Sequence, residues 1–150
     1  MAKSLYTTTS KKNPYYISKH RYLELKHFCL QYPEWKKRYL EIESSIKKSS
    51  YYISTVKNQN ETDSVSETAS ELVELSRKMR IVEQCCNDTD MELSSYIFKA
   101  VTEGCTYEYF QTHSGIPCCR DTFYSRYRKY FWMLNRRWII WIIQKQLKEF

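Results

Sequence analysis

The chain has 150 residues, which suits one domain or one compact domain with a small helical lobe. It contains only 2 glycines and 3 prolines, too few for the tight turns of an all-β protein. The formal net charge of +7 is unevenly distributed: residues 1–48 carry +7, residues 49–117 carry −6 and residues 118–150 carry +6. Two basic ends around an acidic middle favour a polyanionic partner. The alternative is that basic and acidic segments pair inside the fold.

The cysteines predict buried thiols and no metal site. The start of the chain, MAKSLYTTTSKK, has no apolar core of a secretory signal, so we expect an intracellular location and reduced thiols. The adjacent pairs Cys85-Cys86 and Cys118-Cys119 do not match the C-x₂-C spacing of zinc sites.

The longest apolar run, residues 138–143, is far shorter than the roughly 20 residues of a bilayer span. We therefore expect no membrane partner and no cofactor.

The first 48 residues predict a basic arm followed by a helical hairpin. Residues 1–13 are polar and are interpreted as a flexible arm. Ser18 can cap a helix that runs to about Gln31, and Pro33 suits the first turn of a second helix that runs to about Lys47. The first helix places Tyr22, Leu25, Phe28 and Cys29 on one face, and the second places Trp35, Tyr39, Ile42 and Ile46 on one face. Residues 49–63 are rich in Ser, Asn and Thr and predict a linker.

Residues 64–150 predict a second helical domain. Capping-box patterns start a helix that runs to about Cys86, and a third pattern, Thr89-x-x-Glu92, starts a helix that ends at Gly104. The first of these helices has apolar residues at heptad spacing, namely Leu72, Leu75, Met79, Val82 and Cys86. This seam either packs on the chain's own helices or forms a homodimer or larger homo-oligomer. The predicted fold is all-α: an N-terminal helical hairpin and a C-terminal multi-helix bundle.

Residues 106–137 predict a helix-turn-helix. A short helix from Thr106 to about His113 is stopped at Gly115, and a long helix starts near Cys118. At about 100° per residue, that long helix has an apolar stripe made of Phe123, Tyr127, Tyr130, Phe131 and Leu134. Polar and basic side chains lie on the other side. The turn is about two residues longer than in the tightest motifs of this kind, because Phe123 lies eight positions after Gly115.

The exposed side of the long helix supplies the candidate contacts to duplex DNA. They are Arg120, Thr122, Ser125, Arg126, Lys129 and Arg136. Arg120 lies nearest the packing edge of the helix. Possible contacts to the DNA backbone come from Lys36, Lys37 and Arg38. The alternative is a solvated basic helix face that binds no ligand.

The stretch GIPCCRDTFYSRYRKYFWML resembles the C-terminal region of small phage and prophage proteins of Gram-positive bacteria. It is similar in layout to the ArpU/RinA-type phage transcriptional regulators, with residues 122–126 in the place of their Thr-aromatic-Tyr-x-Arg recognition helix. The likeness covers roughly residues 67–137 and implies DNA binding and control of late phage genes. The Pro-Cys-Cys insertion and the Trp/Ile-rich tail depart from that pattern, and they affect promoter control more than DNA binding.

The sequence gives no enzyme signature. The histidines at 20 and 27 flank Glu24 at a loose spacing that a solvated helix face explains, and no phosphate-binding loop, nucleophile elbow or dinucleotide fingerprint occurs. The apolar tail from Trp138 is expected to pack against the N-terminal hairpin, or else against a second subunit.

The favoured function is that of a phage or mobile-element DNA-binding regulator in the cytoplasm of a bacterial host. One alternative is a ring-forming terminase-like DNA-packaging adaptor. The other is a phage inhibitor, of the anti-defence type, that docks on a host nucleoprotein complex.

Overall fold

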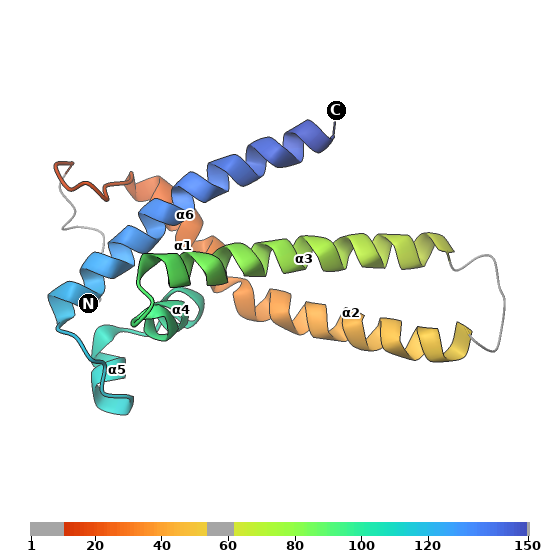
Figure 1. Cartoon of the computed structure of the whole chain (residues 1–150), viewed down its shortest axis with the longest axis horizontal. Coiled ribbons are helices and arrows are strands. Elements are labelled where there is room, and N and C mark those ends of the chain that lie inside the picture. Colours follow the sequence, from red (N-terminus) through yellow and green to blue (C-terminus); the bar gives the residue numbers. More distant parts are fainter. Residues whose placement is uncertain (1–10, 54–61, 150) are drawn as a thin grey trace. The chain divides into compact units, whose positions relative to one another are not determined.

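The computed structural model describes residues 11–53 and 62–149, with side chains omitted at 50–53 and 62–64 (Figure 1). Within these residues every regular element is a helix, which confirms the all-α prediction. The helices are α1 (Lys19–Leu30), α2 (Tyr32–Ile53), α3 (Thr62–Thr89), α4 (Ser94–Glu103), α5 (Tyr107–His113) and α6 (Arg120–Lys148). In the described part of the chain, no helix is both long and apolar enough to cross a membrane.

The chain divides into two compact units, and the division differs from the predicted domains. The first unit, called the bundle here, comprises residues up to 30 and from 81 onward; the second, called the hairpin, comprises residues 31–80. The helix predicted at residues 18–31 therefore groups with the C-terminal helices and not with the helix that follows it. Local periodicity identified both helices, but it carries no information about which distant face each one buries.

The predicted linker at residues 49–63 is wrong at both of its ends. Helix α2 continues to Ile53 and α3 already begins at Thr62, while residues 54–61 lie outside the described residues. Of the predicted arm, residues 1–13, the first ten also lie outside them. The physical reason is the absence of helix breakers, because no glycine or proline occurs between residues 34 and 103. A Ser-rich composition alone does not end a helix.

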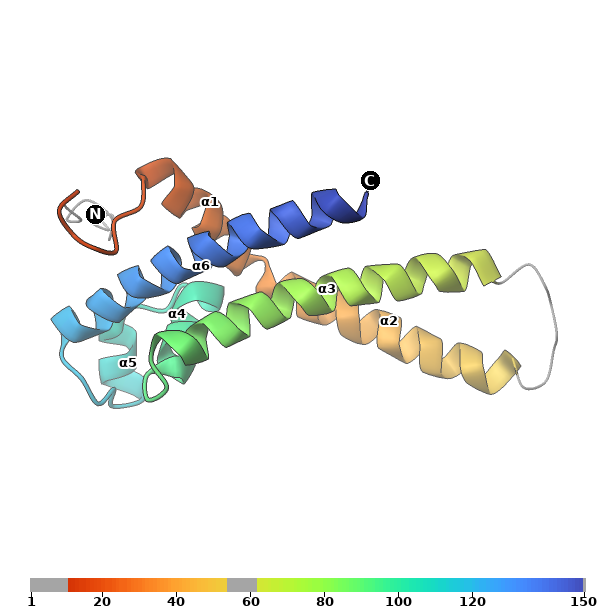
Figure 2. The same cartoon turned by 45° about the horizontal axis from the view of Figure 1, so that its top comes forward.

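The core of the bundle forms where α1 and α4 pack on α6, and Figure 2 shows α1 crossing α6. The hydroxyls of Tyr22 on α1 and Tyr127 on α6 are 3.0 Å apart, and the Tyr22 ring meets Phe131 edge-on at 5.0 Å between centroids. Tyr130 and Leu134 are fully buried in the same core. Every residue of the predicted α6 stripe is buried, so this part of the prediction is confirmed.

Three buried cysteines lie in the bundle. The Cys29 thiol lies 3.5 Å from the Tyr130 hydroxyl, and the Cys85 thiol donates to the Tyr130 carbonyl at 3.5 Å. Burial raises the pKa of Cys29 and of Cys85 to about 12, and it raises the pKa of Cys86 even further. These thiols therefore stay protonated and act as small packing groups, as predicted.

A corner of short helices positions the start of α6. The Phe110 ring of α5 meets Tyr96 of α4 at 5.3 Å and Phe123 of α6 at 5.8 Å between centroids. Gly104 ends α4 with φ of +73°, and Gly115 closes the turn after α5 with φ of +64°. Only glycine adopts these left-handed conformations without strain, so both turns depend on the residue type.

The capping prediction at Thr89 is wrong. The Thr89 hydroxyl donates back to the Cys85 carbonyl at 2.7 Å, because Thr89 is still part of α3. Asp90 instead caps the turn that precedes α4, since its Oδ1 accepts from the backbone N–H groups of Glu92 at 3.0 Å and Leu93 at 3.2 Å. The next helix, α4, therefore begins only at Ser94.

In the hairpin unit, α2 and α3 run antiparallel and side by side in both views (Figures 1 and 2). Ile42 on α2 and Leu75 on α3 are buried. Arg38 donates from Nε and Nη2 to the two carboxylate oxygens of Glu71 at 2.8 and 3.1 Å, and Lys78 lies over the Trp35 ring. Of the predicted heptad seam, Leu75, Val82 and Cys86 are buried within this chain, as one of the two alternatives required.

Candidate nucleic-acid interface

The candidate interface is the exposed face of the first half of α6, opposite its buried stripe. Phe123, Tyr127 and Tyr130 hold the other face of the helix in the bundle core. Residues that lie about half a turn away from this stripe must therefore face outward. Asp121 is the only carboxylate of α6 itself, and it lies in the first turn, where a negative charge suits the helix dipole.

The connector between α5 and α6, residues 114–119, is held in place by side chains. Ile116 is buried, and the Tyr107 hydroxyl donates to the Cys118 carbonyl at 2.8 Å. Cys119 is the N-cap residue of α6, and its exposed thiol lies 3.2 Å from the Thr122 hydroxyl. That hydrogen bond lowers the pKa of the Cys119 thiol. The longer turn expected from the sequence is thus an ordered element that fixes where α6 begins.

Two of the predicted contact residues are held by carboxylates of the same bundle. Arg126 donates from Nε to Asp90 Oδ2 at 3.0 Å, and Asp90 is the residue that caps the turn before α4. Arg120 lies 3.5 Å from a Glu108 carboxylate oxygen and near the Tyr124 ring. Arg137, which the sequence did not single out, pairs with Asp88. Pairing of basic and acidic segments, the alternative weighed from charge, therefore accounts for part of the basic charge.

Other side chains of this face form no ion pair in the part of the chain that the structure describes. Ser125 and Lys129 are half-buried and form no side-chain hydrogen bond or ion pair within the described residues. Arg136 is exposed and lies over the Trp132 ring at 4.8 Å, which orients its guanidinium without neutralising it. Tyr15 packs against the same Trp132 ring at 5.5 Å, so the segment before α1 supports this platform.

Sequence reasoning missed Arg128, which lies at the edge of the same face. It is half-buried and, like Lys129, forms no ion pair within the described part of the chain. Helical spacing places Arg128 one turn before Trp132, so the periodicity of the sequence was enough to assign it to this face. We define the α6 basic face as Thr122, Ser125, Arg128, Lys129 and Arg136.

The three predicted backbone contacts on α2 belong to the hairpin unit. Lys36 and Lys37 are exposed, whereas Arg38 forms the bidentate pair with Glu71 described above. That pair raises the pKa of Arg38 and lowers the pKa of Glu71. Arg38 is also exposed, but its guanidinium links α2 to α3, so among these three residues only the two lysines form no ion pair within the described residues.

The sequence predicts no metal site, and the histidines of α1 can be checked against that expectation. His20 and His27 are both exposed on α1. Among the residues with described side chains, no group of three or more His, Cys, Asp or Glu is arranged to hold a metal ion.

Comparison with protein-family models, with curated proteins and with solved structures finds no match to this chain.

Proposed function

We propose that the protein binds duplex DNA through the α6 basic face and acts as a transcriptional regulator of a phage or mobile element. The observation that carries the proposal is the chemistry of that face. Arg128, Lys129 and Arg136 present cations that no carboxylate of the described chain neutralises, next to the hydroxyls of Thr122 and Ser125. Cations position a protein on phosphates, and short polar side chains near a helix N-terminus approach base edges.

The dimensions of the face suit this assignment. Thr122 and Arg136 are separated by about 21 Å along the helix at 1.5 Å per residue. A major groove is about 12 Å wide, so only the first turns of α6 would lie within it. Thr122 and Ser125 would then meet the bases, while Lys129 and Arg136 would reach the phosphates beside the groove.

The ring-forming adaptor is the weaker alternative. It requires exposed assembly surfaces, and most of the heptad seam that suggested one is buried in this chain, which leaves only the exposed Ile139, Ile140 and Ile143 of the tail to serve as one. The regulator proposal places the protein in the bacterial cytoplasm and assigns it no enzymatic activity and no cofactor.

A matched pair of double variants tests the proposal by fluorescence anisotropy with labelled duplex DNA. K129A/R136A removes two cations of the α6 basic face, and K145A/K148A removes two cations from the far end of the same helix. The first variant should reduce the salt dependence of binding by about one unit of slope for each lost phosphate contact. The second should bind as the parent does. Equal losses in both variants would show that net charge, not this face, drives binding.

A further inference from the structure

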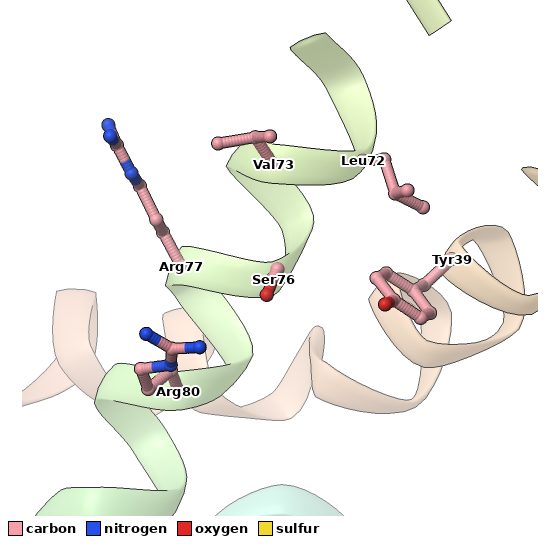
Figure 3. Close-up of a pocket in the computed structure, with 6 residues that line it drawn as sticks. All are labelled: Tyr39, Leu72, Val73, Ser76, Arg77 and Arg80. Carbon is pink, nitrogen blue, oxygen red and sulfur yellow. The ribbon is translucent and has the colours of Figure 1, made fainter. Parts of the chain in front are cut away.

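A hollow of about 310 Å³ opens on one side of the hairpin. Figure 3 shows Tyr39 of α2 facing Leu72 and Ser76 of α3, with Val73, Arg77 and Arg80 on neighbouring turns of α3. All six lining residues belong to the hairpin unit. The hairpin is a single layer of two helices. Neither helix can cover apolar side chains that lie on the outer sides of this layer.

Exposed apolar side chains extend this hollow along α3. Val73 is 53% exposed and Val65 is 44% exposed, and helical spacing places both on the side of α3 that carries Ser76 and Arg80. Tyr39 and Leu72 are half-buried at the floor of the hollow. The result is an apolar strip about two to three helical turns long. A docked amphipathic helix contacts a strip of this length through its residues i, i+3/i+4 and i+7.

One end of the strip is cationic. Arg77 and Arg80 are exposed, and neither forms an ion pair within the described residues. The acidic side chains of this part of α3, Glu67, Glu71 and Glu74, lie on the other side of the helix by its 100° spacing. On α2, Glu43 is paired with Lys47 at 3.5 Å. The hollow therefore combines an apolar floor with unneutralised guanidinium groups.

We propose that this hollow is the docking groove for an amphipathic helix of another protein, one with Leu, Ile or Phe on its inner face and Asp or Glu at one edge. Charge complementarity selects carboxylates opposite Arg77 and Arg80. The apolar floor selects a peptide over a nucleic acid, because a phosphate backbone gains nothing from Leu72 and Val73. A second copy of α3 fits less well, since Glu71 is already held by Arg38 and both Glu67 and Glu74 lie on the side of the helix away from its exposed valines.

The test is a selection from a displayed library of random 16-residue peptides against the full chain. R77E/R80E serves as the counter-target, and K145E/K148E serves as a variant with the same charge change on α6. Selected peptides should carry apolar residues at i, i+3/i+4 and i+7 together with Asp or Glu. They should lose at least about tenfold in affinity with R77E/R80E and little with K145E/K148E.

Three outcomes would overturn the proposal. The first is that no peptide is enriched on the parent over R77E/R80E. The second is that light scattering shows a dimer of the parent which R77E/R80E dissociates, so that a second copy occupies the groove. The third is that R77E/R80E abolishes binding of duplex DNA while the selected peptides bind it unchanged. The proposal does not depend on DNA binding by α6. The K129A/R136A variant should therefore bind the selected peptides with unchanged affinity.

Discussion

The α6 basic face and the hairpin hollow both present cations without carboxylate partners among the described residues, but they differ in the side chains beside those cations. On α6 the first turns carry the hydroxyls of Thr122 and Ser125, and the Trp132 ring lies under Arg136. In the hollow the neighbouring side chains are Tyr39, Leu72 and Val73. Hydroxyl groups beside cations suit hydrated phosphates and base edges, whereas a mainly apolar surface rewards only a ligand that has apolar side chains of its own. Charge attracts a partner, and the groups beside the charges select its class.

The two surfaces also differ in the structure that supports them. The α6 basic face lies opposite an aromatic core, in which Tyr130, Phe123 and Phe131 are almost fully buried. The hollow lies on a hairpin with fewer buried apolar residues, which among those described are Tyr32, Trp35, Ile42 and Leu75. Changes in the bundle core should therefore affect stability and DNA binding together, whereas changes at the hollow should affect only recognition.

The largest expected effect comes from Phe123, which joins α5 to α6. Its ring is fully buried and contacts Tyr107, Phe110 and Tyr127. Phe123→Ala should lower the free energy of unfolding by about 3–5 kcal/mol and should weaken DNA binding as well. Urea unfolding measures the first effect. A loss below about 1 kcal/mol would mean that the α5–α6 corner does not pack as described.

Alkaline pH should destabilise the bundle, because its buried thiols cannot ionise while folded. In the unfolded chain a thiol ionises near pH 8.5, whereas burial raises the pKa of Cys29 and Cys85 to about 12. The stabilisation is complete below pH 8.5 and is lost as pH rises toward 12. Each thiol should reduce the free energy of unfolding by up to about 1.4 kcal/mol per pH unit in that window.

Urea unfolding at pH 7.5, 9 and 10.5 measures this loss, and Cys29→Ala should make the pH dependence shallower. The hairpin has no cysteine between residues 31 and 80, so its surface should be insensitive to this chemistry. A parent whose stability does not change up to pH 10.5 would contradict the burial of the three thiols.

Arg126 and Lys129 should separate structure from recognition. Arg126 pairs with the capping residue Asp90, so Arg126→Ala should lower stability by about 1 kcal/mol or less, given its partial exposure. Lys129→Ala should leave stability unchanged and weaken DNA binding more than Arg126→Ala does. Thermal melting and anisotropy on both variants check this. The reverse pattern would move Arg126 into the interface and Lys129 out of it.

The smallest effect is expected near the end of α6. Trp138 packs against Phe28 of α1 with 4.4 Å between ring centroids, so the start of the tail is intramolecular, as favoured from the sequence. Ile143 is 51% exposed, and Ile143→Ser should change stability by no more than about 0.5 kcal/mol. Trp138→Ala should cost clearly more. Similar melting shifts for the two variants would indicate that Ile143 is covered in solution.

The sequence predicted those features that depend on local periodicity. It located the buried stripe of α6, the face of α1 and the two glycine turns, because each follows from helical spacing or from a positive φ. It did not predict that α1 groups with α6, or that Asp88 and Asp90 neutralise Arg137 and Arg126. These contacts join residues tens of positions apart, and only the folded chain shows which distant groups meet.

The hollow was missed for a related reason. Arg77 and Arg80 belong to none of the sequence motifs, and Tyr39 was predicted to lie in a buried stripe. Only the pairing of α2 with α3 brings them to one opening and shows that Arg38, not Arg77, takes the Glu71 carboxylate.

The most direct test of the central claim is a salt titration of binding between the full chain and mixed-sequence duplex DNA, read by fluorescence anisotropy. Contacts from Arg128, Lys129 and Arg136 predict a log–log slope of about −2 to −3 over 50–200 mM salt, because each phosphate contact contributes nearly one unit. No binding even at 50 mM salt, or an affinity that is independent of salt, would contradict the assignment of the α6 basic face to DNA.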